Sequence, residues 1–166
     1  MSEQEIKETG PLARARVGEE LGVSDWISIT QEMITEFGSA TLDADPMHDD
    51  PAWAAEKSPF GKTIAYGFQT IGLLTHLMRG ALGGEPYATE PSEKGYALNY
   101  GFDRLRLVSP VPVGSNVRGR FRLSDRSVDE KGRIVQRVNA VVEIEHHAAP
   151  ALVADWLFIW VPAEAA

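Results

Sequence analysis

The sequence TIAYGFQTIGLLTHLMRGALGG, residues 63–84, indicates the fold most directly. The residues that recur at helical spacing in it are Ile64, Phe68, Ile71, Leu74, Thr75 and Met78. The stretch is apolar nearly all round, and Gly83-Gly84 ends the pattern. A helix without a polar face must be covered on every side. The stretch therefore predicts a long, buried central helix.

Beyond residue 95 the hydrophobic period changes from 3.6 to 2. The sequence VRGRFRL, residues 117–123, alternates apolar residues with three arginines, which is typical of a half-solvated antiparallel strand. DEKG, residues 129–132, predicts a turn, and residues 134–146 alternate again, so the two segments predict a hairpin. The inward residues of the second strand are Val138, Ala140, Val142 and Ile144. ALVADWLFIWV, residues 151–161, is apolar on both faces and predicts a strand in the middle of a sheet.

The remaining elements complete an α+β pattern. In residues 96–108 the apolar phase shifts, which predicts a bulge near Asp103. Residues 25–30 predict a strand that ends at Thr30, the expected N-cap of a helix over 31–41. A shorter helix is expected after Asp50. The order predicts one antiparallel sheet wrapped around a long central helix, and an open sheet edge favours a homodimer.

Bulk properties exclude several classes of function. The chain has 166 residues, 43% of them hydrophobic, which predicts one domain over 23–166 after a polar leader over 1–22. Cysteine is absent, so disulfides and thiolate metal sites are excluded, and a reducing cytoplasm is expected. The net charge of −8 opposes binding to nucleic acid or anionic lipid. The opening residues lack the pattern of a secretory signal, and no apolar run has the length of a membrane span.

Acidic residues and a histidine, the candidates for acid–base catalysis, gather in TLDADPMHDDPAWAAEK, residues 41–57. Asp43 and His48 can both accept a proton near neutral pH, and a loop turned by Pro46 can bring them to one water molecule. A structural histidine bonded to a nearby aspartate is the alternative interpretation. A calcium loop is not expected, because His48 stands where such a loop requires glycine.

Two separated motifs resemble a known family. DADPMHDDPAWAA, residues 43–55, and FGKTIAYGFQTIGLLTHLM, residues 60–78, resemble the MaoC-type (R)-specific enoyl-CoA hydratases. VSDWISITQEMI and LNYGFDRLRLVSPVPVGSNVRGR resemble the nodulation protein N branch of that family in particular. The resemblance covers about residues 23–162.

The resemblance implies a hot-dog fold, usually dimeric, that hydrates a trans-2-enoyl thioester of CoA or acyl-carrier protein to the (3R)-hydroxyacyl thioester. It implies no metal and no redox cofactor. By position, Asp43 and His48 would be the catalytic pair, and Gly67 would supply the N–H that polarises the thioester carbonyl. Residues expected at the substrate are Tyr66, Thr75, Lys62 and Phe68.

One residue departs from the family pattern. Tyr66 stands where the family usually has a histidine, and a phenol can donate a hydrogen bond but is a poor proton shuttle at neutral pH. This departure keeps open an acyl-thioester binding protein without catalysis. A separate alternative is an acyl-CoA thioesterase with Asp43 as base or nucleophile. The arginines of residues 104–122 can form a phosphate patch or a solvated strand face, and the second is expected for most of them.

Overall fold

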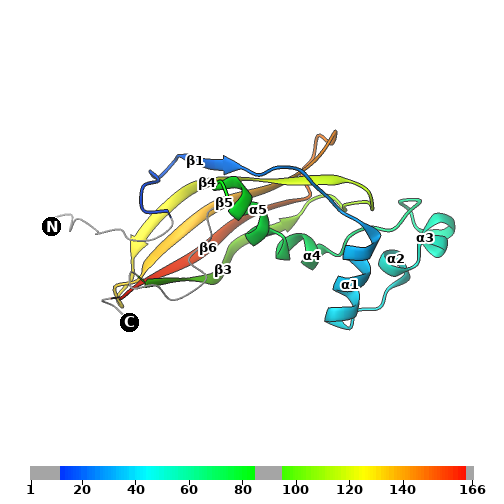
Figure 1. Ribbon diagram of the computed structural model, residues 1–166, viewed down its shortest axis with the longest axis horizontal. Helices are drawn as coiled ribbons and strands as arrows, with labels where there is room; N and C mark the ends of the chain where they lie inside the picture. The colour runs from blue at the N-terminus through cyan, green and yellow to red at the C-terminus, as the bar shows by residue number, and fades with distance from the viewer. Residues whose placement is uncertain (1–11, 85–94, 164–166) are drawn as a thin grey trace.

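The computed structural model describes residues 12–84 and 95–163, which form one antiparallel sheet with helices against one side and at one end (Figure 1). The strands are β1 Glu20–Val23, β2 Ile27–Ser28, β3 Gly95–Leu107, β4 Asn116–Val128, β5 Ile134–Ile144 and β6 Leu152–Pro162. The helices are α1 Gln31–Thr41, α2 Pro46–Asp49, α3 Pro51–Lys57, α4 Gly67–Gly72 and α5 Leu74–Ala81. The strand order is β1-β4-β5-β6-β3, and β2 also pairs with β4. The predicted α+β class is confirmed.

The hairpin of β4 and β5 is confirmed with its inward faces. Val117, Gly119, Phe121 and Leu123 of β4 are buried, as are Val138, Ala140, Val142 and Ile144 of β5. The side chains of these residues, Gly119 excepted, form the core with Leu74, Leu77 and Met78 of α5. Full burial of one such large apolar side chain contributes about 1.5–3 kcal/mol. The sheet is therefore held mainly by the face that α5 covers.

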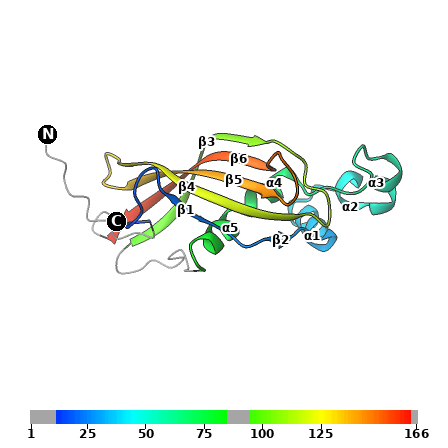
Figure 2. The same ribbon diagram turned by 90° about the horizontal axis from the view of Figure 1, so that it is seen from above.

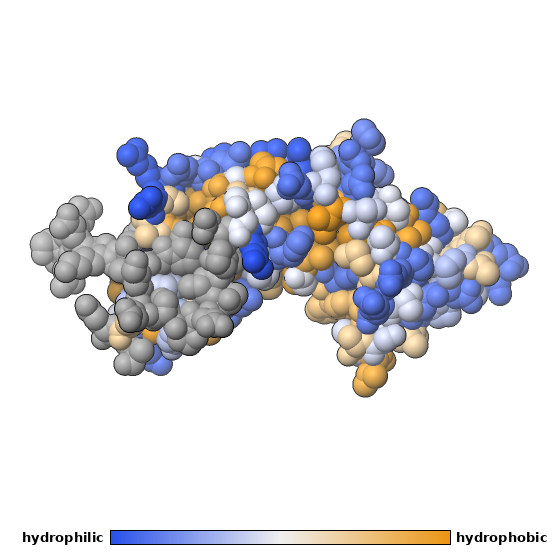
Figure 3. Space-filling view, viewed as in Figure 1, coloured by the Kyte–Doolittle hydropathy of each residue, from blue (hydrophilic) through white to orange (hydrophobic). Residues whose placement is uncertain are grey.

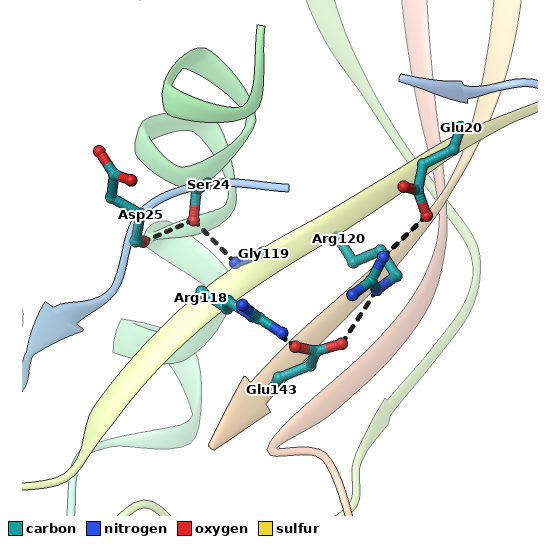
Figure 4. Close-up of polar contacts among 7 residues, drawn as sticks. All are labelled: Glu20, Ser24, Asp25, Arg118, Gly119, Arg120 and Glu143. Carbon is teal, nitrogen blue, oxygen red and sulfur yellow. Dashed lines mark hydrogen bonds and ion pairs between the residues drawn. The ribbon is translucent and has the colours of Figure 1, made fainter. Parts of the chain in front are cut away.

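Gly119 allows α5 to lie directly on β4. A Cβ atom at this position would lie 2.5 Å from Phe121 Cε2 and 2.8 Å from Leu77 Cβ, both too close for a real contact. The Gly119 N–H donates to the Ser24 hydroxyl at 3.0 Å, which ties the chain after β1 to β4 (Figure 4).

Strands β3 and β6 also follow the sequence pattern. The register of β3 against β6 shifts between Asn99 and Gly101 and again between Phe102 and Arg104, so the predicted bulge near Asp103 is confirmed. β6 lies between β5 and β3, as its apolar sequence predicts. β3 forms one edge of the sheet, and its outer side has no paired strand within the described residues.

The central helix is shorter than predicted and is interrupted. Residues 64–66 are not helical, because Ile64 forms a β-bridge with Pro112 and the Ala65 N–H donates to the Val111 carbonyl at 2.8 Å. α4 then begins at Gly67, and Leu73 separates it from α5. The prediction of burial on every side is wrong too. The side chain of Phe68 is 77% exposed and Thr75 is exposed.

The helices α1, α2 and α3 gather beyond one end of the sheet (Figures 1 and 2). Thr30 caps α1 as predicted, and its hydroxyl accepts from the Met33 N–H at 3.2 Å. The strand predicted over 25–30 shrinks to β2, whereas β1 begins earlier, at Glu20.

Part of the expected leader joins the fold. Leu12 is buried in the core and β1 pairs with β4, whereas residues 1–11 lie outside the described part of the chain. The division into 1–22 and 23–166 stays a prediction. Within residues 12–84 and 95–163, no helix has the length and apolar character needed to cross a bilayer.

Candidate active site

The loop between α1 and α3 is shaped by its own aspartates. Leu42 ends α1 in the left-handed conformation at φ 59°, and the Asp43 N–H then donates to the Gly38 carbonyl at 3.0 Å. Asp45 caps the one-turn helix α2, and Asp50 caps α3 as predicted. Asp45 therefore helps to orient the turn that carries the histidine.

His48 is half-buried and is fixed through one ring nitrogen. Its Nδ1 lies 2.7 Å from the carbonyl oxygen of Ile64. A carbonyl oxygen can only accept a hydrogen bond, so Nδ1 carries the proton, and in the neutral ring Nε2 keeps its lone pair. Within the described residues Nε2 has no hydrogen-bond partner. The ring is therefore held with a basic nitrogen available.

His48 and Gly67 line the same cavity, whose volume is about 340 Å³. Most of its other walls are apolar and come from the start of α4 and from the chain that follows β3; they include Ile64, Thr70, Leu107 and Val111. The Gly67 N–H makes no hydrogen bond within the described residues, so it can donate to a ligand. A Cβ atom at Gly67 would overlap Leu107 Cδ1, so a larger residue here would displace the end of that leucine side chain at the cavity.

Asp43 is placed differently from His48 and Gly67. Its side chain is exposed, makes no hydrogen bond within the described residues and does not line the cavity. It joins the site through its backbone, because the Asp43 carbonyl accepts a hydrogen bond from the Tyr66 hydroxyl at 2.6 Å. The shared water between Asp43 and His48 stays a prediction.

The four residues expected at the substrate lie outside the lining of this cavity. Lys62 and Thr75 are exposed, Phe68 projects from α4 into solvent, and Tyr66 is buried behind His48. Their roles toward substrate stay predictions.

Other residues within the family resemblance line the cavity instead. Thr70 stands one turn after Gly67, Leu107 ends β3, and residues 108–111 follow that strand. The sequence SPVPV within the resemblance was the available signal, but only the fold shows that it returns to the start of α4.

Tyr66 is a hydrogen-bond donor and not a proton shuttle. Burial, together with a hydrogen bond to the Asp49 carboxylate and that carboxylate's charge, raises the pKa of Tyr66 to about 12. Its ring stacks on His48, with the ring centres 3.8 Å apart. The phenol therefore stays protonated at neutral pH beside the imidazole.

The arginines of β4 are used within the sheet (Figure 4). Arg118 and Arg120 both contact Glu143 of β5, at 2.6 Å and 3.0 Å, and Arg120 also reaches Glu20 of β1. Burial alone would raise the pKa of Glu143, but the hydrogen bonds from the two arginines lower it. These residues form a solvated strand face, which favours that interpretation over a phosphate patch.

Apolar side chains also reach the surface near the site. The space-filling view shows them in the middle of the face on which α4 and α5 lie (Figure 3). Further exposed apolar residues lie along the edge strand β3, namely Leu98, Tyr100, Phe102 and Leu107.

Comparison with known proteins identifies the class. A family model described as a MaoC like domain matches residues 13–145. Nodulation protein N of Rhizobium meliloti (strain 1021) is 46% identical over 143 residues, which are 86% of this chain and 85% of that protein. The 3-hydroxyacyl-thioester dehydratase Z of Mycobacterium tuberculosis (strain CDC 1551 / Oshkosh) is 40% identical over 141 residues, 85% of this chain and 88% of that protein.

Solved structures agree on the fold. The (R)-hydratase from A. caviae involved in PHA biosynthesis superposes with a TM-score of 0.66 at 19% identity, over 87% of this chain and 96% of that one. The antiparallel sheet and its helices are thus those of a hot-dog dehydratase domain. The chain belongs to the MaoC-like dehydratase family, with nodulation protein N among its relatives, and both predictions are confirmed.

Proposed function

We propose that this protein catalyses the reversible hydration of a trans-2-enoyl thioester to the (3R)-hydroxyacyl thioester. The observation that carries the proposal is the cavity shared by His48 and Gly67, in which an available imidazole nitrogen and an available backbone N–H come together. The names of two relatives, a 3-hydroxyacyl-thioester dehydratase and an (R)-hydratase, agree with this chemistry.

In the proposed reaction each residue has one task. His48 Nε2 takes a proton from water as the water oxygen bonds to C3 of the substrate. The electron pair of the double bond moves toward the thioester carbonyl, whose developing negative charge the Gly67 N–H stabilises. His48 Nε2 then gives the proton that it took from water to C2 on the same face, so the imidazole ends the cycle neutral. Asp43, whose carboxylate has no other partner among the described residues, orients the attacking water.

The protein is proposed to work as a homodimer joined along β3. Within the described residues β3 forms an edge of the sheet and carries Leu98, Tyr100 and Phe102, a surface that a second copy would cover. The substrate is a thioester of CoA or acyl-carrier protein, and the negative net charge argues against nucleic acid as a partner. The cysteine-free sequence fits a reducing cytoplasm.

The test is hydration of crotonyl-CoA and longer trans-2-enoyl-CoA esters, followed by loss of the conjugated absorbance. His48→Gln is expected to lower kcat at least about 100-fold, as loss of a general base does, and Asp43→Asn is expected to do the same. His76→Gln is a matched control, because His76 is exposed on α5 and is not among the residues that line the cavity. Full activity in both site variants would overturn the proposal.

The same assay separates the alternatives. A thioesterase would release free thiol from a saturated acyl-CoA, whereas a hydratase leaves the thioester intact. A binding protein without catalysis would retain the CoA ester unchanged. Chiral analysis of the 3-hydroxyacyl product decides the (3R) assignment.

A further inference from the structure

Tyr66, which replaces the usual histidine of the family pattern, contacts the loop that carries both candidate catalytic residues. It is only 3% exposed and directly precedes α4. Its hydroxyl donates to the Asp43 carbonyl at 2.6 Å and lies 3.1 Å from Asp49 Oδ2. Its ring stacks on His48 with an interplanar angle of 28°. One side chain therefore contacts the loop at its start, at its histidine and at the residue after it.

We propose that Tyr66 is a positioning residue that sets the place of Asp43 relative to His48, with Asp49 as the second acceptor of its hydroxyl. The inference rests on the proposed hydration. A hydroxyl has one proton, and the shorter of its two contacts goes to the Asp43 backbone. The carboxylate of Asp49 accepts when the hydroxyl turns away. The loop is thus held through its backbone, and the Asp43 carboxylate stays available for water.

The surroundings are built to admit this hydroxyl. Gly38 of α1 faces it so closely that a Cβ atom there would overlap the Tyr66 oxygen. Asp49 Oδ1 is buried without a hydrogen-bond partner among the described residues, so Tyr66 provides the carboxylate with its one side-chain hydrogen bond there. Loss of the hydroxyl would leave the Asp43 carbonyl without its side-chain donor and would remove the alternative donor of the Asp49 carboxylate, which is costly in a partly buried place.

A histidine in this position would have to reach the Asp43 carbonyl and the Asp49 carboxylate with a shorter side chain. The phenol oxygen extends beyond the ring, and the space that Gly38 leaves is at that oxygen. The Tyr66 side chain therefore fits this place as a support of the loop. Restoring histidine is expected to give no gain in hydration.

The first experiment compares steady-state kinetics of the full chain with those of Tyr66→Phe. The variant keeps the ring that stacks on His48 and removes only the hydroxyl. We expect kcat to fall about 10- to 100-fold, as misplacement of a catalytic group by about 1 Å does, with KM changed less than about twofold. Val138→Ala, in the sheet core, is the control for lost stability, and it should leave kcat unchanged.

Two further variants sharpen the assignment. Asp49→Asn keeps an oxygen that can accept from Tyr66 and should retain the kcat of the parent, whereas Asp49→Ala should lower it. Equal kcat values for these two variants would remove Asp49 from the proposal. An increase of kcat in Tyr66→His above the parent would overturn the role of Tyr66 as an adequate support.

The second experiment does not depend on turnover. Hydrogen exchange followed by NMR reports the Asp43 amide, which donates to Gly38. In Tyr66→Phe this amide should exchange about tenfold faster, the factor that corresponds to loss of one net hydrogen bond, while amides of β5 stay unchanged. Unchanged exchange at Asp43, or unchanged kcat in an active parent, overturns the proposal. Absence of hydration in the parent would instead refute the proposed function, and exchange would still decide the role of Tyr66.

Discussion

The outer face of the sheet and the loop of residues 43–50 are both rich in charged residues, yet they hold their polar groups differently. On the sheet, Arg118, Arg120 and Glu143 contact one another side chain to side chain, with about a third of each side chain exposed. In the loop, the Tyr66 hydroxyl and the Gln31 amide reach backbone carbonyls, at Asp43 and His48. The first arrangement orders side chains, whereas the second orders the chain itself.

The difference bears on why the proposed function is placed in the loop and not on the sheet face. Exposed ion pairs are screened by water and contribute about 0–1 kcal/mol each. Hydrogen bonds to the backbone of a short loop fix the positions of every side chain on it, including those that make no bond of their own. A few neutral hydrogen-bond donors to its backbone therefore fix the geometry of a catalytic loop better than a larger number of surface ion pairs.

The largest expected effect concerns Gly38. Gly38→Ala should bring the new methyl group against the Tyr66 hydroxyl and destabilise the protein, whereas Gly72→Ala on α4 meets nothing within 4 Å. Because alanine favours a helix, the second change should stabilise the protein, and the two variants should differ by about 3 kcal/mol in the free energy of unfolding. Urea denaturation measures the difference. Equal stability of the two variants would contradict the prediction, because it would show that the loop and Tyr66 can move to accept the methyl group.

The next effect is a loss of stability at high pH. The folded-state pKa of Tyr66 lies near 12, above the unfolded value of 10.0, so its contribution is fully present below pH 10 and is lost as the pH rises toward 12. A shift of this size corresponds to between about 2 and 3 kcal/mol. Between pH 9 and pH 12 the free energy of unfolding should therefore fall more steeply for the parent than for Tyr66→Phe. Parallel curves would contradict the expectation.

A smaller effect is expected at the second support of the loop. Gln31→Met removes the amide that donates to the His48 carbonyl at 2.7 Å and accepts from the Thr63 hydroxyl. The free energy of unfolding should fall by about 1–2 kcal/mol, because a partly buried carbonyl loses its hydrogen-bond donor. Hydration should slow about tenfold, the factor that corresponds to 1.4 kcal/mol of misplaced catalytic geometry. Thermal melts and enoyl-CoA kinetics check both, and Glu32→Gln on the exposed face of α1 is the control.

The smallest effect belongs to the outer face. Arg120→Met keeps the aliphatic stem and removes the contacts to Glu143 and Glu20, so stability should fall by less than about 1 kcal/mol. Hydration should stay unchanged. If this variant instead lowered kcat as Gln31→Met is expected to, the distinction between the two regions would fail.

Sequence alone predicted the sheet better than the site. The alternation around Phe121 and Val138 was sufficient, because successive residues of a strand point to opposite faces of the sheet. A buried face is therefore visible in the local sequence as every second residue. The start of the central helix at residue 63 was wrong, because Ile64 and Ala65 are held by residues 111 and 112, which no local pattern reveals.

The site shows the same limit. Family resemblance pointed to His48 and Gly67, and the fold brings both to one cavity. Thr70, which also lines it, and Gln31, which supports the loop, gave no signal, since their partners lie in other elements. Tyr66 was expected at the substrate by its place in the motif, whereas its burial follows from the space left by Gly38.

In the proposed hydration, the hydrogen bond between His48 Nδ1 and the Ile64 carbonyl would have a consequence for repeated turnover. The same Nδ1–H is present in the neutral and in the doubly protonated ring, so loading and unloading a proton at Nε2 leaves this anchor intact. The imidazole has no need to rotate or exchange tautomers between cycles. Because Ile64 is itself bridged to Pro112, the resting orientation is restored by the fold and not by the substrate.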